Sequence, residues 1–172
     1  MTSLLNRLIA KFARSLYLRR HNKAWEGIAR AKVPVSNLCV ELDGRQVSLR
    51  MYHGNADKPM VIYTHGGGWV VGSLDTHDRF CRALSQQSGC SLISIDYRLA
   101  PEYQFPAAHD DSLEASRWVI DNLTNLAPNN GMFILAGDSA GGNIAIATTL
   151  ALTHQYGMAG CLAINPATQH YI

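Results

Sequence analysis

The most constraining feature of the sequence is a regular alternation of short apolar runs with segments of helical length. The apolar runs are five residues long and cover residues 60–64, 91–95, 132–136 and 161–165. Between them, helical patterns cover residues 76–88, 106–123 and 143–156. Strands that alternate with helices in this way form a mainly parallel sheet with helices on both faces. The sequence therefore predicts an α/β fold.

Ahead of the first apolar run, the sequence predicts a helix and a β-hairpin. Residues 35–42 and 45–52 alternate between apolar and polar side chains around Asp43-Gly44, a pair typical of a two-residue turn with positive φ at both positions. Residues 3–30 carry apolar side chains at helical spacing, with cations on the other face, and we expect this helix to pack on the protein. We divide the chain into an N-terminal helical segment, 1–34, and an α/β domain, 35–172.

The charge of the chain is concentrated at its N-terminus. The net charge of +2 excludes a strongly basic nucleic-acid-binding protein. Residues 1–32 hold eight cations against Glu26 alone, a net +7, so the remainder carries −5. A basic amphipathic helix can also lie on a membrane surface or act as a transit peptide. Residues 139–172 contain no charge, but polar side chains interrupt them, so we expect a buried helix and strand there and no membrane span.

The four cysteines are scattered, with neither C-x-x-C spacing nor clustering with histidine. They are Cys39, Cys81, Cys90 and Cys161. This pattern predicts reduced thiols in a cytoplasmic protein, without a metal site. Cations at positions 7, 11 and 14 interrupt any apolar core of a signal peptide, so we expect no secretion signal.

The segment Gly137-Asp138-Ser139-Ala140-Gly141 matches G-x-S-x-G between a predicted strand and a predicted helix. In this context, small residues beside the serine permit a tight turn that exposes its hydroxyl at the carboxyl end of the sheet. The N-terminus of the following helix favours developing negative charge. The motif predicts Ser139 as a nucleophile, although a purely structural turn would give the same local pattern.

A second glycine-rich segment, His65-Gly66-Gly67-Gly68-Trp69, follows the first apolar run. Glycines leave backbone N–H groups unshielded, as an oxyanion hole requires, and such a loop acts together with the N–H after the nucleophile, here Ala140. Phosphate binding is the alternative, but no G-K-[ST] follows and G-x-G-x-x-G is not matched. The two motifs together favour a serine hydrolase over a nucleotide-binding protein.

With Asp96-Tyr97-Arg98-Leu99-Ala100-Pro101-Glu102 and Phe105-Pro106-Ala107, the sequence resembles the hormone-sensitive-lipase-like branch of the α/β-hydrolases, especially bacterial acetyl esterases. The resemblance implies the α/β-hydrolase fold and hydrolysis of short-chain carboxylic esters through an acyl-Ser139 intermediate, without a cofactor. It implies that Gly67, Gly68 and Ala140 supply the oxyanion-hole N–H groups, and that His65 orders its loop. It also implies that the N-terminal helix forms part of a cap over the acyl pocket.

The tail of the sequence departs from the family pattern, whose order is Ser, then Asp or Glu, then His. No acidic residue follows Ser139. His154 is predicted near the far end of the following helix, on the order of 20 Å away, and His170 lies two residues from the last. We therefore expect the chain to correspond to roughly the N-terminal half of a family member, or to be an inactive hydrolase-like domain. The histidines that precede the serine are expected to be structural or at the surface, namely His21, His53, His77 and His109.

The last predicted strand, 161–165, has no later strand in this sequence to cover it. An exposed strand edge is a template for pairing with another chain. We therefore expect self-association through this edge, with a small-molecule ester as the only other partner.

Overall fold

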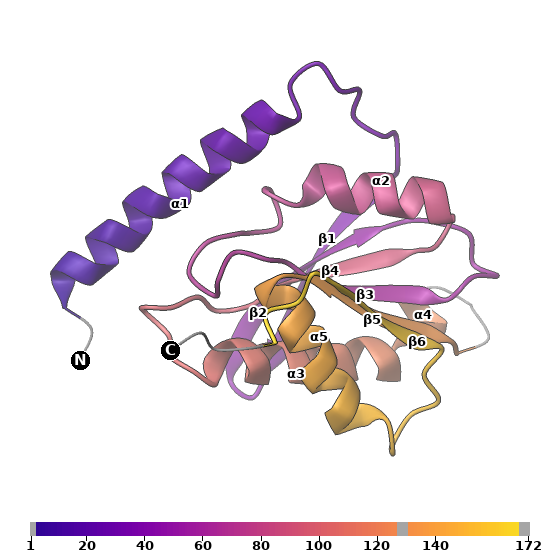
Figure 1. Ribbon diagram of the computed structural model, residues 1–172. Coiled ribbons are helices and arrows are strands. Elements are labelled where there is room, and N and C mark those ends of the chain that lie inside the picture. Colours follow the sequence, from indigo (N-terminus) through magenta and orange to yellow (C-terminus); the bar gives the residue numbers. More distant parts are fainter. Residues whose placement is uncertain (1–2, 127–130, 169–172) are drawn as a thin grey trace.

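The four predicted apolar runs form the parallel centre of one six-stranded sheet (Figure 1). The computed structural model describes residues 3–126 and 131–168. Its parallel strands are β3 (Met60–Thr64), β4 (Leu92–Asp96), β5 (Phe133–Asp138) and β6 (Gly160–Ile164). They are arranged in the order β4-β3-β5-β6, so the carboxyl ends of β3 and β5 lie next to each other. The α/β fold predicted from the alternation is confirmed.

The Asp-Gly hairpin extends the sheet beyond β4. β1 (Val35–Leu42) and β2 (Arg45–Tyr52) pair antiparallel, and β2 also pairs antiparallel with β4. Both turn residues have positive φ, 47° at Asp43 and 74° at Gly44. The predicted turn and both strand ranges are confirmed, because Asp and Gly tolerate the backbone conformation that this tight turn imposes.

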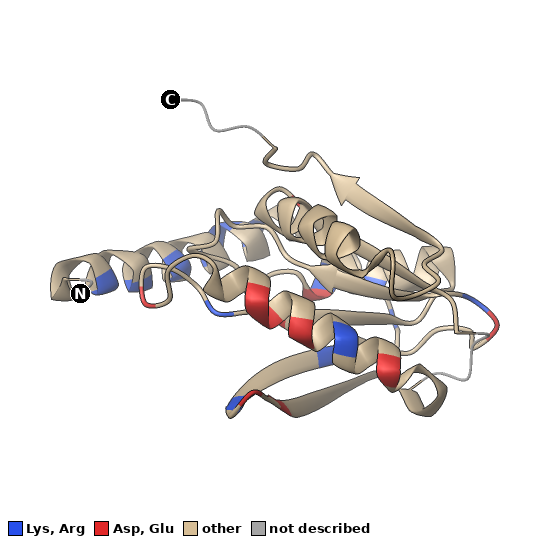
Figure 2. Cartoon of the chain, turned by 90° about the horizontal axis from the view of Figure 1, so that it is seen from below, with Lys and Arg blue, Asp and Glu red and all other residues tan. Residues whose placement is uncertain are grey.

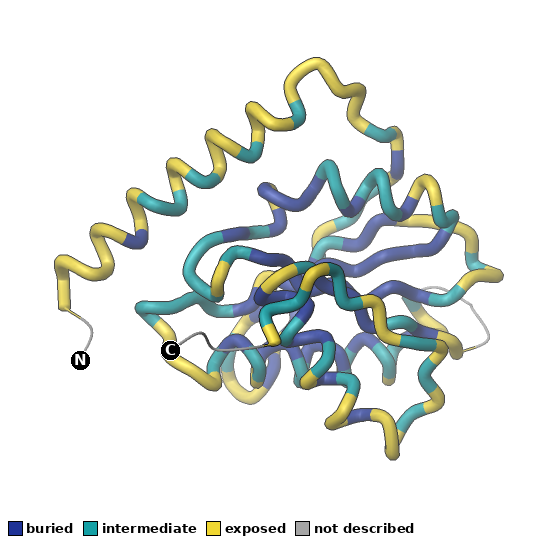
Figure 3. The backbone as a smooth tube through the Cα atoms, viewed as in Figure 1, coloured by how far each residue is buried: buried dark blue, intermediate teal, exposed yellow. Residues whose placement is uncertain are grey.

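Helices cover both faces of the sheet, as the alternation predicts. They are α2 (Asp78–Ser88) on one face, and α3 (Ala107–Asp121), α4 (Leu123–Leu126) and α5 (Ala140–Leu152) on the other. The pleat of β3 divides the core, because Ile62 packs in the cluster with α3 and α5, whereas Tyr63 packs in the cluster with α2. Figure 3 shows the buried central strands inside a more exposed rim.

The helix after the G-x-S-x-G motif differs from its predicted bounds at both ends. α5 begins at Ala140 instead of Asn143 and ends at Leu152 instead of Tyr156. Glycines are poor helix formers, which led to the late predicted start, but tertiary packing holds Gly141 and Gly142 in the first turn. As a consequence, His154 lies beyond the helix as an exposed turn residue.

The N-terminal helix does not pack on the protein through its apolar residues. In α1 (Leu4–Ala24), Leu4, Leu8 and Phe12 are 75%, 56% and 72% exposed. The helix contacts the body through the opposite face, where Ala10 is buried and Arg14 hydrogen-bonds to two loops. The helix therefore packs on the protein, as expected, but not through the face that bears Leu8 and Phe12, and it ends well before residue 30. Figure 2 shows Lys and Arg, but neither Asp nor Glu, along α1.

The charge-free stretch from Ser139 onward forms α5 and β6. The expected burial of its strand is wrong, because β6 pairs with β5 on one side only and Leu162 is 45% exposed. In the ranges 3–126 and 131–168, no helix combines the length and the apolar character that crossing a membrane requires.

A close approach of two backbones places the N-terminus of α5 against the end of β3. A Cβ added at Gly141 would lie 2.0 Å from the carbonyl oxygen of Thr64, and one added at Gly137 would lie 2.7 Å from the same oxygen. Both distances are too short for any side chain, so the two outer glycines of the G-x-S-x-G motif are sterically required. This contact joins the serine turn to the strand that leads into the second glycine-rich segment.

We predict that Gly141→Ala lowers the free energy of unfolding by at least about 3 kcal/mol, because the added methyl group overlaps fixed backbone atoms. The control is Gly157→Ala, since a Cβ at Gly157 meets nothing within 4 Å. Its effect should stay within about 1 kcal/mol. Urea denaturation followed by circular dichroism measures both variants. Equal stabilities would contradict the packing described here.

Candidate active site

Ser139 occupies a strained turn between β5 and α5. Its backbone angles are φ 50° and ψ −117°, a conformation that costs a non-glycine residue about 1–3 kcal/mol. The turn is held by three backbone hydrogen bonds. The Ser139 N–H donates to the carbonyl of Ile164 (2.9 Å), and the Ser139 carbonyl accepts from Asn143 (3.1 Å) and Ala167 (3.1 Å). The side chain is exposed at the carboxyl end of the sheet, where the motif predicts it.

The second glycine-rich segment forms a tight loop directly after β3. Gly67 and Gly68 have φ of 132° and 59°, and a Cβ at Gly67 would lie 2.1 Å from the Val71 carbonyl oxygen. The Gly67 carbonyl accepts hydrogen bonds from the N–H groups of Val70 (3.1 Å) and Val71 (3.0 Å), which turns the loop back on itself. Positive φ continues to Trp69 (59°), but only Gly67 also lacks room for a Cβ, so glycine is sterically required at Gly67.

Both segments contain backbone N–H groups that are free to donate. Among the described residues, the N–H groups of Gly67, Gly68 and Ala140 donate to no acceptor. An oxyanion hole consists of such preorganised donors, aimed at the position where negative charge develops. Ala140 is also the first residue of α5, so its N–H lies at the positive end of the helix.

The carboxylate of Asp138 links the serine turn to the glycine-rich loop. Its Oδ1 accepts a hydrogen bond from the Gly66 N–H (2.8 Å) and one from the Tyr63 hydroxyl, and lies 3.5 Å from His77 Nε2. Burial alone would raise the pKa of Asp138, but these hydrogen bonds and the charge of His77 lower it to about 2. A Cβ at Gly66 would lie 2.2 Å from the carboxylate, so this glycine also leaves room for the contact.

His65 is buried within the glycine-rich loop. Its Nδ1 donates to the Gly66 carbonyl (2.9 Å), and its ring stacks on Tyr97 at 4.3 Å between centroids. The Tyr97 hydroxyl donates to the His65 carbonyl (2.6 Å). Burial lowers the pKa of His65 to about 4, so the ring is neutral at pH 7. These contacts fit the loop-ordering role that the resemblance implies.

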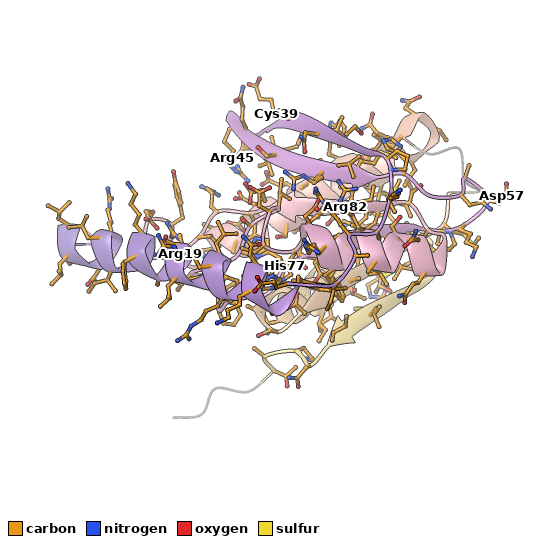
Figure 4. The ribbon with its side chains drawn as sticks, turned by 90° about the horizontal axis from the view of Figure 1, so that it is seen from above. Arg19, Cys39, Arg45, Asp57, His77 and Arg82 are labelled. Carbon is orange, nitrogen blue, oxygen red and sulfur yellow. The ribbon has the colours of Figure 1, made fainter. Side chains whose placement is uncertain are left out.

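Two other histidines have roles that sequence reasoning missed. His77 is buried at the start of α2 beside α1, with Nδ1 2.9 Å from the hydroxyl of Thr76 and Nε2 near Asp138 (Figure 4). His109, in the first turn of α3, hydrogen-bonds through Nε2 to Asn143 Oδ1 (3.1 Å). Asn143 donates from Nδ2 to the Ala167 carbonyl (2.8 Å), which fixes its Oδ1 as an acceptor and Nε2 of His109 as the donor. The spacing of these histidines in the sequence does not predict contacts with residues as distant as Asp138 and Asn143.

A cavity of about 520 Å³ opens beside the glycine-rich loop and the first turn of α5. Aromatic and small apolar residues form most of its wall, with a histidine and an asparagine as polar groups. The lining residues are Gly68, Trp69, Ala100, Tyr103, Phe105, Ala108, His109, Asn143, Ala167 and Thr168.

A general base for Ser139 is not found within residues 3–126 and 131–168, because no histidine or carboxylate there hydrogen-bonds to its Oγ. His154 lies beyond the end of α5, and His170 lies outside the described residues. Across that same part of the chain, the side chains form no cluster of His, Cys, Asp and Glu suited to a metal ion, and all four cysteines are free.

Residues 61–171 match the family model described as the α/β hydrolase fold. The chain belongs to this family. The resemblance inferred from the motifs is thereby confirmed. The ethyl acetate hydrolase of Pseudomonas putida is 42% identical over 108 residues, which cover 60% of this chain and 34% of that protein. The arylesterase of Saccharolobus solfataricus is 36% identical over 149 residues, which cover 83% of this chain and 49% of that protein.

Solved structures show the same relationship. A hyperthermophilic esterase from the archaeon Pyrobaculum calidifontis has a TM-score of 0.85 and 36% identity, with 92% of this chain and 52% of that chain covered. EstE1, a thermophilic carboxylesterase from a metagenomic library, has a TM-score of 0.85 and 31% identity. The chain therefore spans about a third to a half of the length of these relatives.

We predict that Asp138→Asn destabilises the protein by about 1–3 kcal/mol at pH 7, since the amide keeps the size of the side chain but loses its charge. The native pKa of about 2 lies below the ordinary value of 3.8, so this contribution is complete above about pH 4 and is lost as the pH falls through 2. The stability difference between wild type and variant should therefore shrink over this range in urea denaturation. The exposed Asp57, labelled in Figure 4, supplies the control Asp57→Asn, which should show no such change. A constant Asp138→Asn difference from pH 7 to pH 2 would contradict the assigned role.

Proposed function

We propose that this chain carries the nucleophile and the oxyanion hole of a carboxylic-ester hydrolase that acts on short acyl chains. The observation that carries the proposal is the exposed Ser139 in its strained turn, joined through Asp138 to the glycine-rich loop with its free N–H groups. The relatives named above support it, because their names describe ester hydrolysis.

In the first step, Ser139 Oγ attacks the ester carbonyl carbon and its proton passes to solvent water, because no described histidine or carboxylate hydrogen-bonds to Oγ. The carbonyl oxygen becomes an oxyanion that accepts hydrogen bonds from the free N–H groups of Gly67, Gly68 and Ala140. Collapse of this intermediate breaks the bond to the alcohol oxygen, which leaves protonated, and forms acyl-Ser139. Water then attacks the acyl group through a second oxyanion and releases the carboxylic acid. A largely apolar cavity and preorganised donors favour both steps, and the proposed chemistry uses neither a metal nor an organic cofactor.

The cavity beside Gly68 supports a small or flat ester group as the substrate class. Its volume of about 520 Å³ and its aromatic lining suit a short acyl chain or a single ring.

We further propose that the N-terminal segment, residues 1–34, acts as a cap for the domain 35–172. We also propose that the protein is cytoplasmic, in keeping with its free cysteines.

We predict that 4-nitrophenyl acetate acylates the protein at Ser139 and that Ser139→Ala abolishes this labelling. Peptide mapping by mass spectrometry identifies the acetylated residue. Ser88→Ala, which changes a serine whose hydroxyl bonds to the Leu84 carbonyl (2.6 Å), is the control and should leave the labelling intact. Acetyl groups spread over several serines and lysines, and unchanged by Ser139→Ala, would contradict the proposal.

Steady-state turnover of the 172-residue chain should nevertheless be near background. A serine hydroxyl with no base to remove its proton is a poor nucleophile at neutral pH. Donors and binding alone leave about 10³–10⁴-fold catalysis over water in triad enzymes. Turnover on the order of 1–10³ s⁻¹ that disappears in Ser139→Ala would show that a base does reach Ser139, against this expectation.

Self-association through β6 is the second part of the proposal. The strand pairs with β5 on one side, and its other edge offers unpaired N–H and C=O groups to another chain. We predict concentration-dependent dimers or larger species in sedimentation velocity, reduced by Leu162→Lys because a charge at the edge opposes pairing. Leu150→Lys, at a residue of α5 that is 70% exposed, is the control. A stable monomer at all concentrations would contradict the proposal.

A further inference from the structure

Arg14 joins α1 to two loops that are far from it in the sequence. Its Nε donates to the Val70 carbonyl (2.8 Å), and its Nη2 donates to the Ala100 carbonyl (2.8 Å). The two Nη atoms also form a bidentate pair with the Glu102 carboxylate, at 3.0 Å and 2.6 Å. One guanidinium thus contacts three acceptors on two loops, which a lysine ammonium could not reproduce in this planar geometry.

The two loops that Arg14 connects are the ones that form the proposed site. Val70 belongs to the loop whose Gly67 and Gly68 carry the free N–H groups, and both loops line the cavity. They also touch each other directly, since the Ala100 N–H donates to the Trp69 carbonyl (2.8 Å). Arg14 therefore closes a ring of hydrogen bonds that links the two loops.

Arg14 is not needed to build α1 or to tether its C-terminal end. The helix begins at an N-cap formed by Ser3, whose Oγ accepts from the Asn6 N–H (3.2 Å). The segment after the helix is held by the ion pair of Arg30 with Asp78 and by the hydrogen bond from Arg79 to the Ile28 carbonyl (2.7 Å). The contacts of Arg14 instead lie at the loops of the site.

We propose that Arg14 is a positioning residue, which holds the 67–71 loop against the 98–102 loop and so fixes the oxyanion donors and the cavity wall. That these loops serve catalysis rests on the proposed function. That Arg14 holds the two loops together rests only on the hydrogen bonds described above. An exposed ion pair with Glu102 would contribute little by itself. The Arg14 and Glu102 side chains are only 29% and 26% exposed, however, and two backbone carbonyls share the guanidinium.

The test is residue-resolved amide hydrogen exchange, measured by NMR on the 172-residue chain. The reporters are the hydrogen-bonded amides of Val70, Val71 and Ala100. In Arg14→Met, these amides should exchange about tenfold faster or more, because the loops lose charge-assisted hydrogen bonds. In Arg14→Lys, the increase should be smaller. Arg14→Ala leaves room for an added guanidinium, and millimolar methylguanidinium should restore slow exchange to that variant. Arg19→Met, at an exposed cation of the same helix (Figure 4), is the matched control and should change none of the three.

Unchanged exchange at the three amides in Arg14→Met would overturn the proposal. If Arg14→Met loses protection throughout β3, β4 and β5, the variant has been destabilised as a whole. The milder variant Glu102→Gln, which removes only the carboxylate charge, is then measured in its place. In Glu102→Gln, faster exchange confined to the same three amides supports the proposal. Unchanged exchange at these amides in that variant overturns it. Labelling of Ser139 with 4-nitrophenyl acetate is measured on the same samples. Unlabelled wild-type Ser139 would contradict the proposed function and leave the exchange result interpretable.

Discussion

The close contact between the serine turn and the end of β3 is the constraint on which the rest of the site depends. Gly141 has no room for a Cβ because the Thr64 carbonyl oxygen occupies that space, and Gly137 has none because the carbonyl oxygens of Gly141 and Thr64 do. This contact fixes where α5 begins and holds Ser139 in its strained conformation. Because Thr64 ends β3, the same contact also fixes where the glycine-rich loop begins. Ser139 and the free N–H groups of the glycine-rich loop are therefore placed by backbone packing rather than by their own side chains.

Side-chain contacts then fix the position of the glycine-rich loop relative to the turn that holds Ser139. The Asp138 carboxylate, one residue before Ser139, accepts a hydrogen bond from the Gly66 N–H and so joins the loop to the turn. Arg14 acts on the far side of the same loop, through the Val70 carbonyl. Polar groups buried in this way contribute to stability only while each has its partner, so the loss of one should loosen the loop before it unfolds the sheet.

Local sequence signals predicted the elements that depend on local physics. The Asp43-Gly44 turn follows from the φ values it needs, and the parallel strands follow from short apolar runs. The helical spacing of apolar residues predicted the face of α1 that bears Leu8 and Phe12. This spacing does not determine whether that face is buried against protein or exposed to solvent. The start of α5 at Ala140 was missed because the propensity of its glycines is overridden by packing. The contacts of Arg14, His77 and His109 join residues more than thirty positions apart, and no local pattern encodes them.

We infer that Ser139 and the free N–H groups of two separate segments converge on one oxyanion position. A crystal structure of the protein with a small phosphonate bound covalently to Ser139 would show whether they do. We expect one phosphonyl oxygen within about 2.7–3.1 Å of the amide nitrogen of Ala140 and of that of Gly67 or Gly68. A phosphonyl oxygen that points away from the glycine-rich loop, with the Ala140 nitrogen more than about 8 Å from both glycine nitrogens, would contradict it.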